Sequence, residues 1–199
     1  MNRADGATPL TPDEKRQLIP QHIVTRGELD ALEQSNIINA EEWLTGLSAR
    51  KEILDIDFIR ELHHRMFGEV WGWAGEFSHE KNRYPIGDDG PNIEPNLRTL
   101  IDDSYYWIEN DVYKDAYECA AEFHHRLTNI HPFPNGNGRF ARILTDLFME
   151  RNLKNPAIKW LGHDLRGEES TDRKRYIEAL RKADNHDKKH LIELFKEWA

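Results

Sequence analysis

The chain has 199 residues, which is enough for one compact domain with a sizeable core. Its net charge of −9 argues against a surface built to neutralise nucleic-acid phosphates or anionic lipid headgroups. The single cysteine, Cys119, excludes an internal disulfide and a thiolate zinc site, and no apolar run is long enough for a leader or a membrane span. These features predict a cytoplasmic protein that binds neither a nucleic-acid polymer nor a membrane.

Helix signals follow a small, polar lead. Pro12, with acids directly behind it, predicts a short helix that Pro20 ends. Thr25 and Glu28 form a capping-box pattern ahead of a longer amphipathic helix, and Asp57 indicates the start of a third helix.

The helical period is lost between Gly68 and Pro95, where glycines and prolines cluster, so we expect a loop or hairpin there. Further helices are predicted from Leu97, from Asp115 and from Phe140, and near residues 171–183 and 187–198. The pattern is typical of a mainly α, single-domain fold. We place a lead and short helix in residues 1–24 and the domain in residues 25–199, with its core from about residue 57.

The break after the helix from Asp115 carries most of the chemical signal. Gly136 and Gly138 allow positive φ angles, so that backbone N–H groups can form a concave nest for an anion. The following helix adds its own free N–H groups and the positive end of its dipole. Because Arg139 and Arg142 lie three positions apart, both guanidinium groups can grip the phosphates of one small polyphosphate.

His131 precedes this nest, and its imidazole suits a general base near neutral pH. The alternative is that the segment merely joins two helices and that its arginines are solvated. Four separate requirements (a base, a nest, a helix start and two arginines) coincide within twelve residues, which favours a phosphate site.

The segment from His131 to Arg142 resembles the signature of the Fic (Fido) domain family, H-x-F-x-[D/E]-G-N-G-R-x-x-R. The resemblance extends over roughly residues 57–199 and includes the stretch Trp71–Gly75. Its nearest subgroup is the one called mobile mystery protein B. The resemblance implies a helical Fic-like fold with a short β-hairpin flap.

The resemblance also implies a protein adenylyltransferase, which moves AMP from ATP to a Ser, Thr or Tyr hydroxyl of a target protein or of itself. His131 would be the general base, and Arg139 would stabilise the pyrophosphate leaving group. Arg142 would reach the γ-phosphate, and Phe133 would hold the loop in the core. The implied nucleotide-binding residues are Phe133, Asn135, Gly136, Asn137, Gly138, Arg139, Arg142 and Tyr176.

Asn135 departs from the family pattern, which has Asp or Glu at this position to hold Mg²⁺. An amide oxygen can still bind Mg²⁺ or Mn²⁺, because such ions commonly use one or two protein groups together with phosphates and water. We therefore expect a weakly held metal at Asn135. Transfer of another phosphate-containing group and a non-catalytic nucleotide-binding or protein-interaction module are the alternatives.

Two further features concern the target protein and the nucleotide base. The family's flap docks its target by strand addition, and here its tip would comprise Arg83, Tyr84, Pro85 and Ile86. An ordinary surface loop is the alternative for these residues. Tyr176 could stack on adenine or serve as a plain core aromatic.

Regulation and metal binding give the last hypotheses. Glu33 is the candidate for the inhibitory glutamate of the family, although its surroundings lack the complete inhibitory motif; otherwise it is an exposed helical carboxylate. His186 and His190 could hold a cation, but a solvated helix face is favoured. A homodimer or a regulatory partner is also considered.

Overall fold

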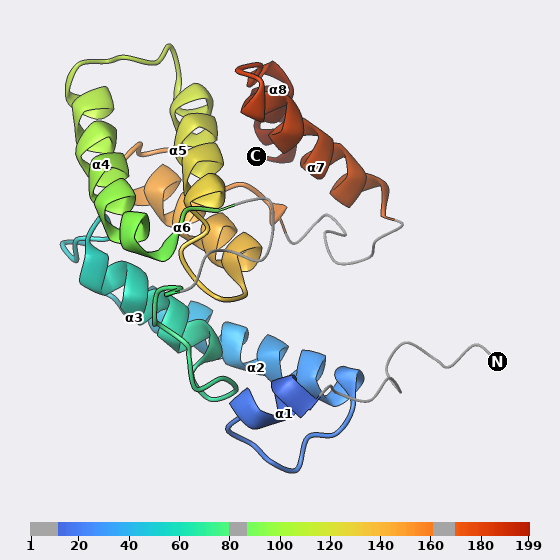
Figure 1. The fold of residues 1–199 in the computed structure, drawn as a ribbon. Coiled ribbons are helices and arrows are strands. Elements are labelled where there is room, and N and C mark those ends of the chain that lie inside the picture. The colour runs from blue at the N-terminus through green and yellow to red at the C-terminus, as the bar shows by residue number, and fades with distance from the viewer. Residues whose placement is uncertain (1–11, 80–86, 161–169) are drawn as a thin grey trace. The chain divides into compact units, whose positions relative to one another are not determined.

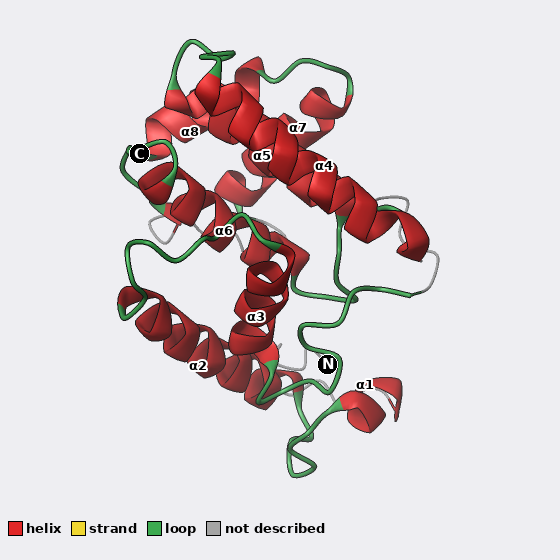
Figure 2. Cartoon of the chain, turned by 90° about the vertical axis from the view of Figure 1, so that its left-hand side faces the viewer, coloured by secondary structure: helices red, strands yellow, loops and turns green. Residues whose placement is uncertain are grey.

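The structure, a computed structural model, describes residues 12–79, 87–160 and 170–199, which its contacts divide into two compact units (Figure 1). One unit comprises the described residues of Met1–Ser78 together with Phe133–Gly136, and the other comprises those of His79–Pro132 and Asn137–Ala199. The described part contains helices and one isolated bridge, and none of these helices is long and apolar enough to cross a membrane (Figure 2). The mainly α class is confirmed.

The predicted hairpin flap is not seen among the described residues. Its expected tip, Arg83, Tyr84, Pro85 and Ile86, lies outside them. The neighbouring residues 76–79 and 87–89 have no strand.

The first unit contains α1 (Pro12–Gln17), α2 (Arg26–Thr45) and α3 (Ile56–Phe67), with α2 packed against α3. The predicted capping box is present at the start of α2. Thr25 Oγ1 accepts from the Glu28 N–H at 3.4 Å, and Glu28 Oε2 accepts from the Thr25 N–H at 3.0 Å. Helix α3 buries the predicted apolar face, which comprises Phe58, Ile59, Leu62 and Met66.

Asp55, and not Asp57, caps α3. The Asp55 carboxylate accepts from the N–H groups of Asp57 and Phe58, each at 3.1 Å. Asp57 lies in the first turn instead, where a negative charge still interacts favourably with the helix dipole. The predicted start at Asp57 therefore lies one residue after the first residue of α3, Ile56.

The second unit contains α4 (Gly90–Glu109), α5 (Ala116–Ile130), α6 (Asn137–Arg151), α7 (Thr171–Asp184) and α8 (Lys189–Trp198). Helix α5 packs against α4, α6 and α8, and α7 packs against α8. The helix predicted from Asp115 is present, and Asp115 caps it, because its carboxylate accepts from the N–H groups of Tyr117 and Glu118 at 3.0 Å. The central place of α5 matters because His131 follows directly at its C-terminus.

Helix α4 begins at Gly90, earlier than the predicted start at Leu97. Pro91 was read as a helix breaker, but it occupies the first turn, where a backbone N–H has no partner within the helix. Pro95 lies inside the helix and removes the hydrogen bond that would run back to the Pro91 carbonyl. The prolines therefore mark the N-terminal end of α4 and not a loop.

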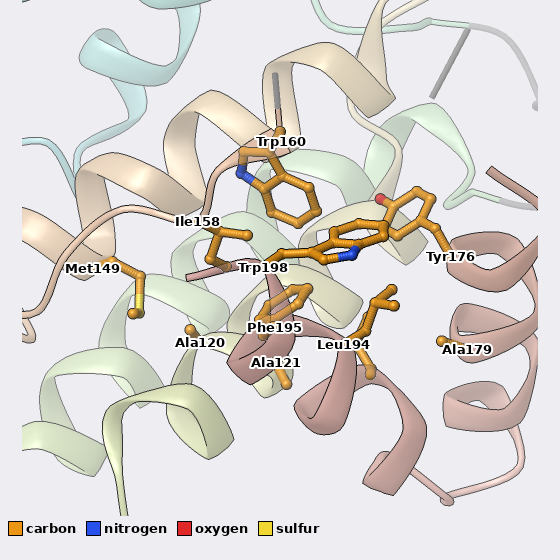
Figure 3. Packing of buried hydrophobic residues seen from close by; sticks show 11 residues of the cluster. Ala120, Ala121, Met149, Ile158, Trp160, Tyr176, Ala179, Leu194, Phe195 and Trp198 are labelled. Carbon is orange, nitrogen blue, oxygen red and sulfur yellow. The ribbon is translucent and has the colours of Figure 1, made fainter. Parts of the chain in front are cut away.

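Aromatic rings fill the core that α7 and α8 share with α5, α6 and the segment after α6 (Figure 3). The Trp160 ring makes edge contacts with Phe195, Trp198 and Tyr176, with ring centroids 5.2, 5.9 and 6.0 Å apart. Burying an aromatic side chain of this size stabilises the fold by about 2–3 kcal/mol. This core holds α7, and with it Tyr176, in a defined position.

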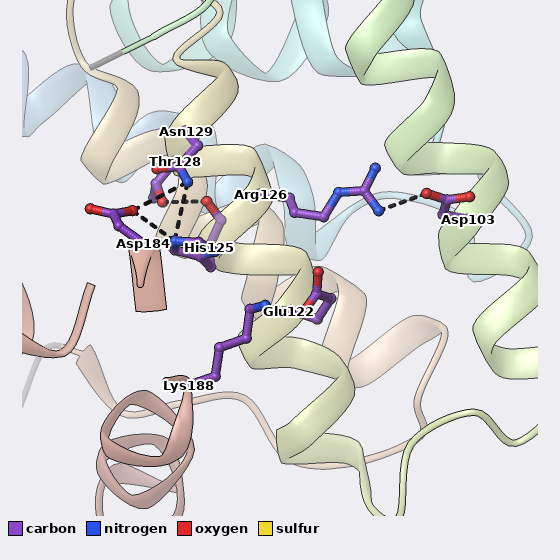
Figure 4. A network of polar contacts seen from close by, with 8 residues as sticks. All are labelled: Asp103, Glu122, His125, Arg126, Thr128, Asn129, Asp184 and Lys188. Carbon is purple, nitrogen blue, oxygen red and sulfur yellow. Dashed lines mark hydrogen bonds and ion pairs between the residues drawn. The ribbon is translucent and has the colours of Figure 1, made fainter. Parts of the chain in front are cut away.

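Polar and charged side chains also connect α5 to its neighbours (Figure 4). The contacts are His125–Asp184 at 2.9 Å, Asn129–Asp184 at 3.3 Å, Lys188–Glu122 at 2.7 Å and Arg126–Asp103 at 2.6 Å. They reach α4 on one side and the α7–α8 region on the other, so the C-terminal half of α5 is held from two directions.

Candidate active site

The predicted phosphate-binding segment passes through both units of the chain. His131 and Pro132 belong to the second unit, Phe133–Gly136 to the first, and Asn137 onward to the second again. Each part is therefore described with its own unit.

His131 ends α5 in a left-handed backbone conformation, with φ 51° and ψ 58°. This conformation is uncommon for a residue other than glycine. Its half-buried imidazole hydrogen-bonds the Thr128 carbonyl, and burial lowers its pKa more than this hydrogen bond raises it. Because a carbonyl only accepts, the bonded ring nitrogen carries the proton and the other nitrogen of the neutral ring has a lone pair. His131 can therefore act as a base at neutral pH.

His63 on α3 holds the part of the segment that belongs to the first unit. Its imidazole is fully buried and stacks on Phe133, with the ring centroids 3.6 Å apart. The Gly75 N–H donates to Nδ1 at 3.0 Å, so Nε2 carries the proton and donates to the Asn135 carbonyl at 3.1 Å. His63 thus holds both a side chain and the backbone of the loop.

Gly136 requires the absence of a side chain. Its φ is +78°, and a β-carbon there would lie 2.6 Å from Cε2 of Phe67 and 3.3 Å from Nε2 of His63. The Gly136 N–H donates to the Asn135 amide oxygen at 2.7 Å. The loop therefore has its shape fixed by packing and by its own hydrogen bond.

Arg142 is fixed within the second unit. A β-carbon at Gly138 would lie 3.7 Å from Nη1 of Arg142, so the guanidinium group reaches back to the first turn of α6. It also hydrogen-bonds the Tyr176 hydroxyl. Burial lowers the pKa of Arg142, but an arginine side chain still remains charged near neutral pH. No acid lies in the first turn of α6, so the helix terminus and the guanidinium together favour an anion.

Residues 53–149 match the model of the Fic/DOC family. The chain contains a Fic domain. The subgroup named from the sequence stays a prediction.

Curated relatives of this Fic domain come from bacteria and animals. A probable protein adenylyltransferase of Aquifex aeolicus is 35% identical over 96 residues, which are 47% of this chain and 25% of that protein. A protein adenylyltransferase Fic of Nematostella vectensis is 27% identical over 198 residues, which are 96% of this chain and 43% of that protein. The chain spans about a quarter of the length of the first curated relatives that it matches.

Solved structures share the fold. Fic-1 from C. elegans (residues 134–508 of that protein) has a TM-score of 0.68 and 25% identity, over 95% of this chain and 55% of that chain. BepC from Bartonella tribocorum, solved with bound AMPPNP, has a TM-score of 0.67 and 16% identity, over 98% of this chain and 94% of that chain. The second likeness concerns the fold alone.

Two predicted site residues of the Fic domain lie in buried surroundings. Tyr176 is 4% exposed and belongs to the aromatic core, and its adenine-stacking role stays a prediction. Glu33 is 7% exposed, and its carboxylate accepts from the Trp71 indole N–H at 2.7 Å. The alternative of an exposed helical carboxylate is therefore wrong for Glu33, and its inhibitory role stays a prediction.

The described residues provide few candidate ligands for a metal ion. They contain no group of three or more His, Cys, Asp or Glu side chains that could hold an ion. His186 lies at a turn with φ 65°, and His190 approaches Asp187 at 3.7 Å. Asn135 supplies one neutral oxygen, which already accepts the Gly136 N–H. These donors fit only an ion held mainly by a nucleotide's phosphates and by water.

His63, Phe67 and His124 were not assigned roles from the sequence. In the sequence, His63 and His124 are each followed directly by another histidine. Their positions in the helical pattern were a signal that they are buried. His63 and Phe67 belong to the buried residues of α3, as Leu62 does, and His124 belongs to those of α5, as Phe123 does. Which groups those faces contact is a property of the tertiary fold.

Proposed function

We propose that the chain transfers AMP from ATP to a Ser, Thr or Tyr hydroxyl of a protein, which includes the chain itself as a substrate. The observation that carries this proposal is the place of His131, which ends α5 with its imidazole hydrogen-bonded to the Thr128 carbonyl, six residues before the first residue of α6. The relatives named protein adenylyltransferases support the same reaction.

In the proposed reaction, His131 takes the proton of the target hydroxyl. The hydroxyl oxygen then bonds to the α-phosphorus of ATP, and the bond from that phosphorus to the bridging oxygen of the β-phosphate breaks. Pyrophosphate leaves with the electron pair. General-base catalysis of this kind contributes roughly 10²–10⁴-fold to a rate.

The chain's cations and backbone amides hold the phosphates in this proposal. Gly136, whose own N–H donates to the Asn135 amide oxygen, shapes the loop beside the phosphates. Asn137 and Gly138 offer N–H groups at the start of α6 to the α- and β-phosphates. Arg139 stabilises the leaving pyrophosphate, and Arg142 binds the γ-phosphate. Asn135 would hold Mg²⁺ or Mn²⁺ through its amide oxygen, and such an ion would supply further charge stabilisation to the phosphates.

The partners and the inhibition expected from the sequence belong to the same proposal. Residues 83–86 would dock the target segment, and the chain would form a homodimer or bind a regulatory protein. Glu33 would restrain the enzyme, and Glu33→Gln tests this, because Gln keeps an acceptor for the Trp71 indole while it removes the charge. A higher AMP-transfer rate supports inhibition by Glu33, whereas an unchanged rate removes it from consideration.

The AMP-transfer proposal is tested by incubating wild type, His131→Ala and His190→Ala with ATP and Mg²⁺ or Mn²⁺ in a cell lysate, followed by mass spectrometry. His190 is an exposed histidine on α8 and serves as the matched control. Wild type and His190→Ala should add AMP to proteins, and His131→Ala should lose this activity by about 10²-fold or more.

The non-catalytic alternative has its own supporting observation, since the metal-binding carboxylate of the family is replaced here by an amide oxygen that bonds Gly136. If wild type and His131→Ala both bind ATP and neither adds AMP, the enzyme proposal is wrong. If a different phosphate-containing group is added, the transferred mass identifies it.

A further inference from the structure

A buried chain of polar groups runs from Arg142 through the core of the second unit. Arg142 hydrogen-bonds the Tyr176 hydroxyl, which lies 2.7 Å from Nε2 of His124. The other ring nitrogen of His124 lies 2.8 Å from the Thr145 hydroxyl, and this hydroxyl donates to the Ala141 carbonyl at 2.7 Å. The groups come from α5, α6 and α7.

The direction of every hydrogen bond in this chain can be assigned. The Thr145 proton is committed to the Ala141 carbonyl, so the Thr145 oxygen must accept from Nδ1–H of His124. Full burial and the nearby Arg142 charge lower the pKa of His124 to about 3, so its ring is neutral and Nε2 accepts. Tyr176 therefore donates to Nε2, and its oxygen lone pairs face the guanidinium of Arg142.

Among the residues that the structure describes, these groups lie in buried and largely apolar surroundings. Tyr176, His124 and Thr145 are 4%, 0% and 0% exposed. The His124 ring lies against Trp160 and Phe195, with ring centroids 5.4 and 5.5 Å apart. A core built only for stability could use apolar side chains here, because buried polar groups are costly unless each is satisfied. The chain of groups ends on a residue of the proposed phosphate site.

We propose that Tyr176 and His124 are positioning residues that hold the Arg142 guanidinium in place to recognise a terminal third phosphate. This inference rests on the proposed function for the role of Arg142, and it adds that Tyr176 and His124 set the preference for a nucleoside triphosphate over a diphosphate. It also gives Tyr176 a role that its buried ring can perform without contact to adenine.

The test compares ATP and ADP binding by calorimetry in wild type, Tyr176→Phe and Tyr117→Phe. Tyr117 is the matched control, since it packs at the edge of the same core. Loss of a hydrogen bond to a charged group should weaken ATP binding by Tyr176→Phe about 10- to 100-fold, with ADP binding unchanged. Tyr117→Phe should change neither affinity. Equal losses for ATP and ADP would overturn the proposal, because a fault in the fold or at adenine affects both nucleotides.

A second measurement separates a direct role from one that acts through Arg142. In an Arg142→Ala background, Tyr176→Phe should cause no further loss of ATP affinity, because the group that Tyr176 positions is already absent. An additional loss of tenfold or more would mean that Tyr176 acts elsewhere, and would overturn the proposal.

The hydrogen-bonded chain can be tested without nucleotide. Nitrogen NMR of the wild-type protein should show His124 as the neutral tautomer with the proton on Nδ1. The substitution Tyr176→Phe should shift the Nε2 resonance of His124. The opposite tautomer would refute the positioning role even if AMP transfer is found. If the His124 tautomer is as expected but ATP does not bind, the proposed function fails and the hydrogen-bonded chain stands.

Discussion

The two parts of the segment from His131 to Arg142 are held by different kinds of interaction. In the first unit, His63 and Phe67 fix residues 133–136 by ring packing and by hydrogen bonds to the backbone. In the second unit, a hydrogen-bonded chain of side chains reaches Arg142. The first arrangement determines the path of the backbone, and the second determines where a charge is placed. Substitutions around residues 133–136 should therefore lower the free energy of unfolding. Substitutions in the hydrogen-bonded chain that reaches Arg142 should instead alter which nucleotide the protein binds.

The largest expected loss of stability comes from Gly136→Ala. The added β-carbon would meet the Phe67 ring at 2.6 Å, and the positive φ is unfavourable for alanine. Together these effects should lower the free energy of unfolding by about 2–5 kcal/mol. Chemical denaturation measures the change.

Gly138→Ala is the control for this substitution. Its added β-carbon would meet nothing closer than 3.7 Å, so its free energy of unfolding should change by less than about 1 kcal/mol. Equal effects of the two alanines would contradict the packing around Gly136.

A smaller loss is expected from His63→Phe, which keeps a ring against Phe133 but removes both hydrogen bonds. The Gly75 N–H and the Asn135 carbonyl then lose their partner, which should cost about 1–3 kcal/mol of unfolding free energy. His64→Phe is the control, since the neighbouring His64 is exposed and bonds one carbonyl. If both variants lose the same amount, His63 has no special role in holding the loop.

In the second unit, the buried His124 should make the free energy of unfolding depend on pH. The pKa of His124 is about 3 in the folded protein and about 6.5 in an unfolded chain, so the unfolded state binds more protons between these values. This contribution to stability is fully present above pH 6.5 and is lost as the pH falls toward 3. The slope it adds is at most about 1.4 kcal/mol per pH unit.

Denaturation of wild type and His124→Gln between pH 4.5 and 7.5 checks this prediction. The variant should have the shallower dependence, because glutamine does not titrate. Identical slopes would mean that His124 is not buried as a neutral ring.

Local sequence patterns were sufficient where a structure depends on near neighbours. Thr25 with Glu28 predicted the start of α2, and Asp115 predicted the start of α5, because a capping side chain and the N–H groups that donate to it lie within four residues. The same kind of reasoning misplaced the start of α4, since Pro91 is a signal for a helix start as well as for a break.

The sequence could not show what holds the signature segment. His63 lies 72 residues from Asn135, and His124 lies 52 residues from Tyr176, so no local pattern connects them. The residues of the segment itself were identified because backbone nest, helix start and arginines are consecutive in the chain. Their supports are tertiary, and they became visible only once the helices were packed.

The most direct test of the proposed chemistry is the pH dependence of AMP transfer by wild type at saturating ATP. His131 has a pKa below its ordinary value of about 6.5, so the rate should be level from about pH 7 upward and should fall on the acid side, with a midpoint below 6.5. A rate that does not change between pH 4.5 and 8 would contradict the role of His131 as the base.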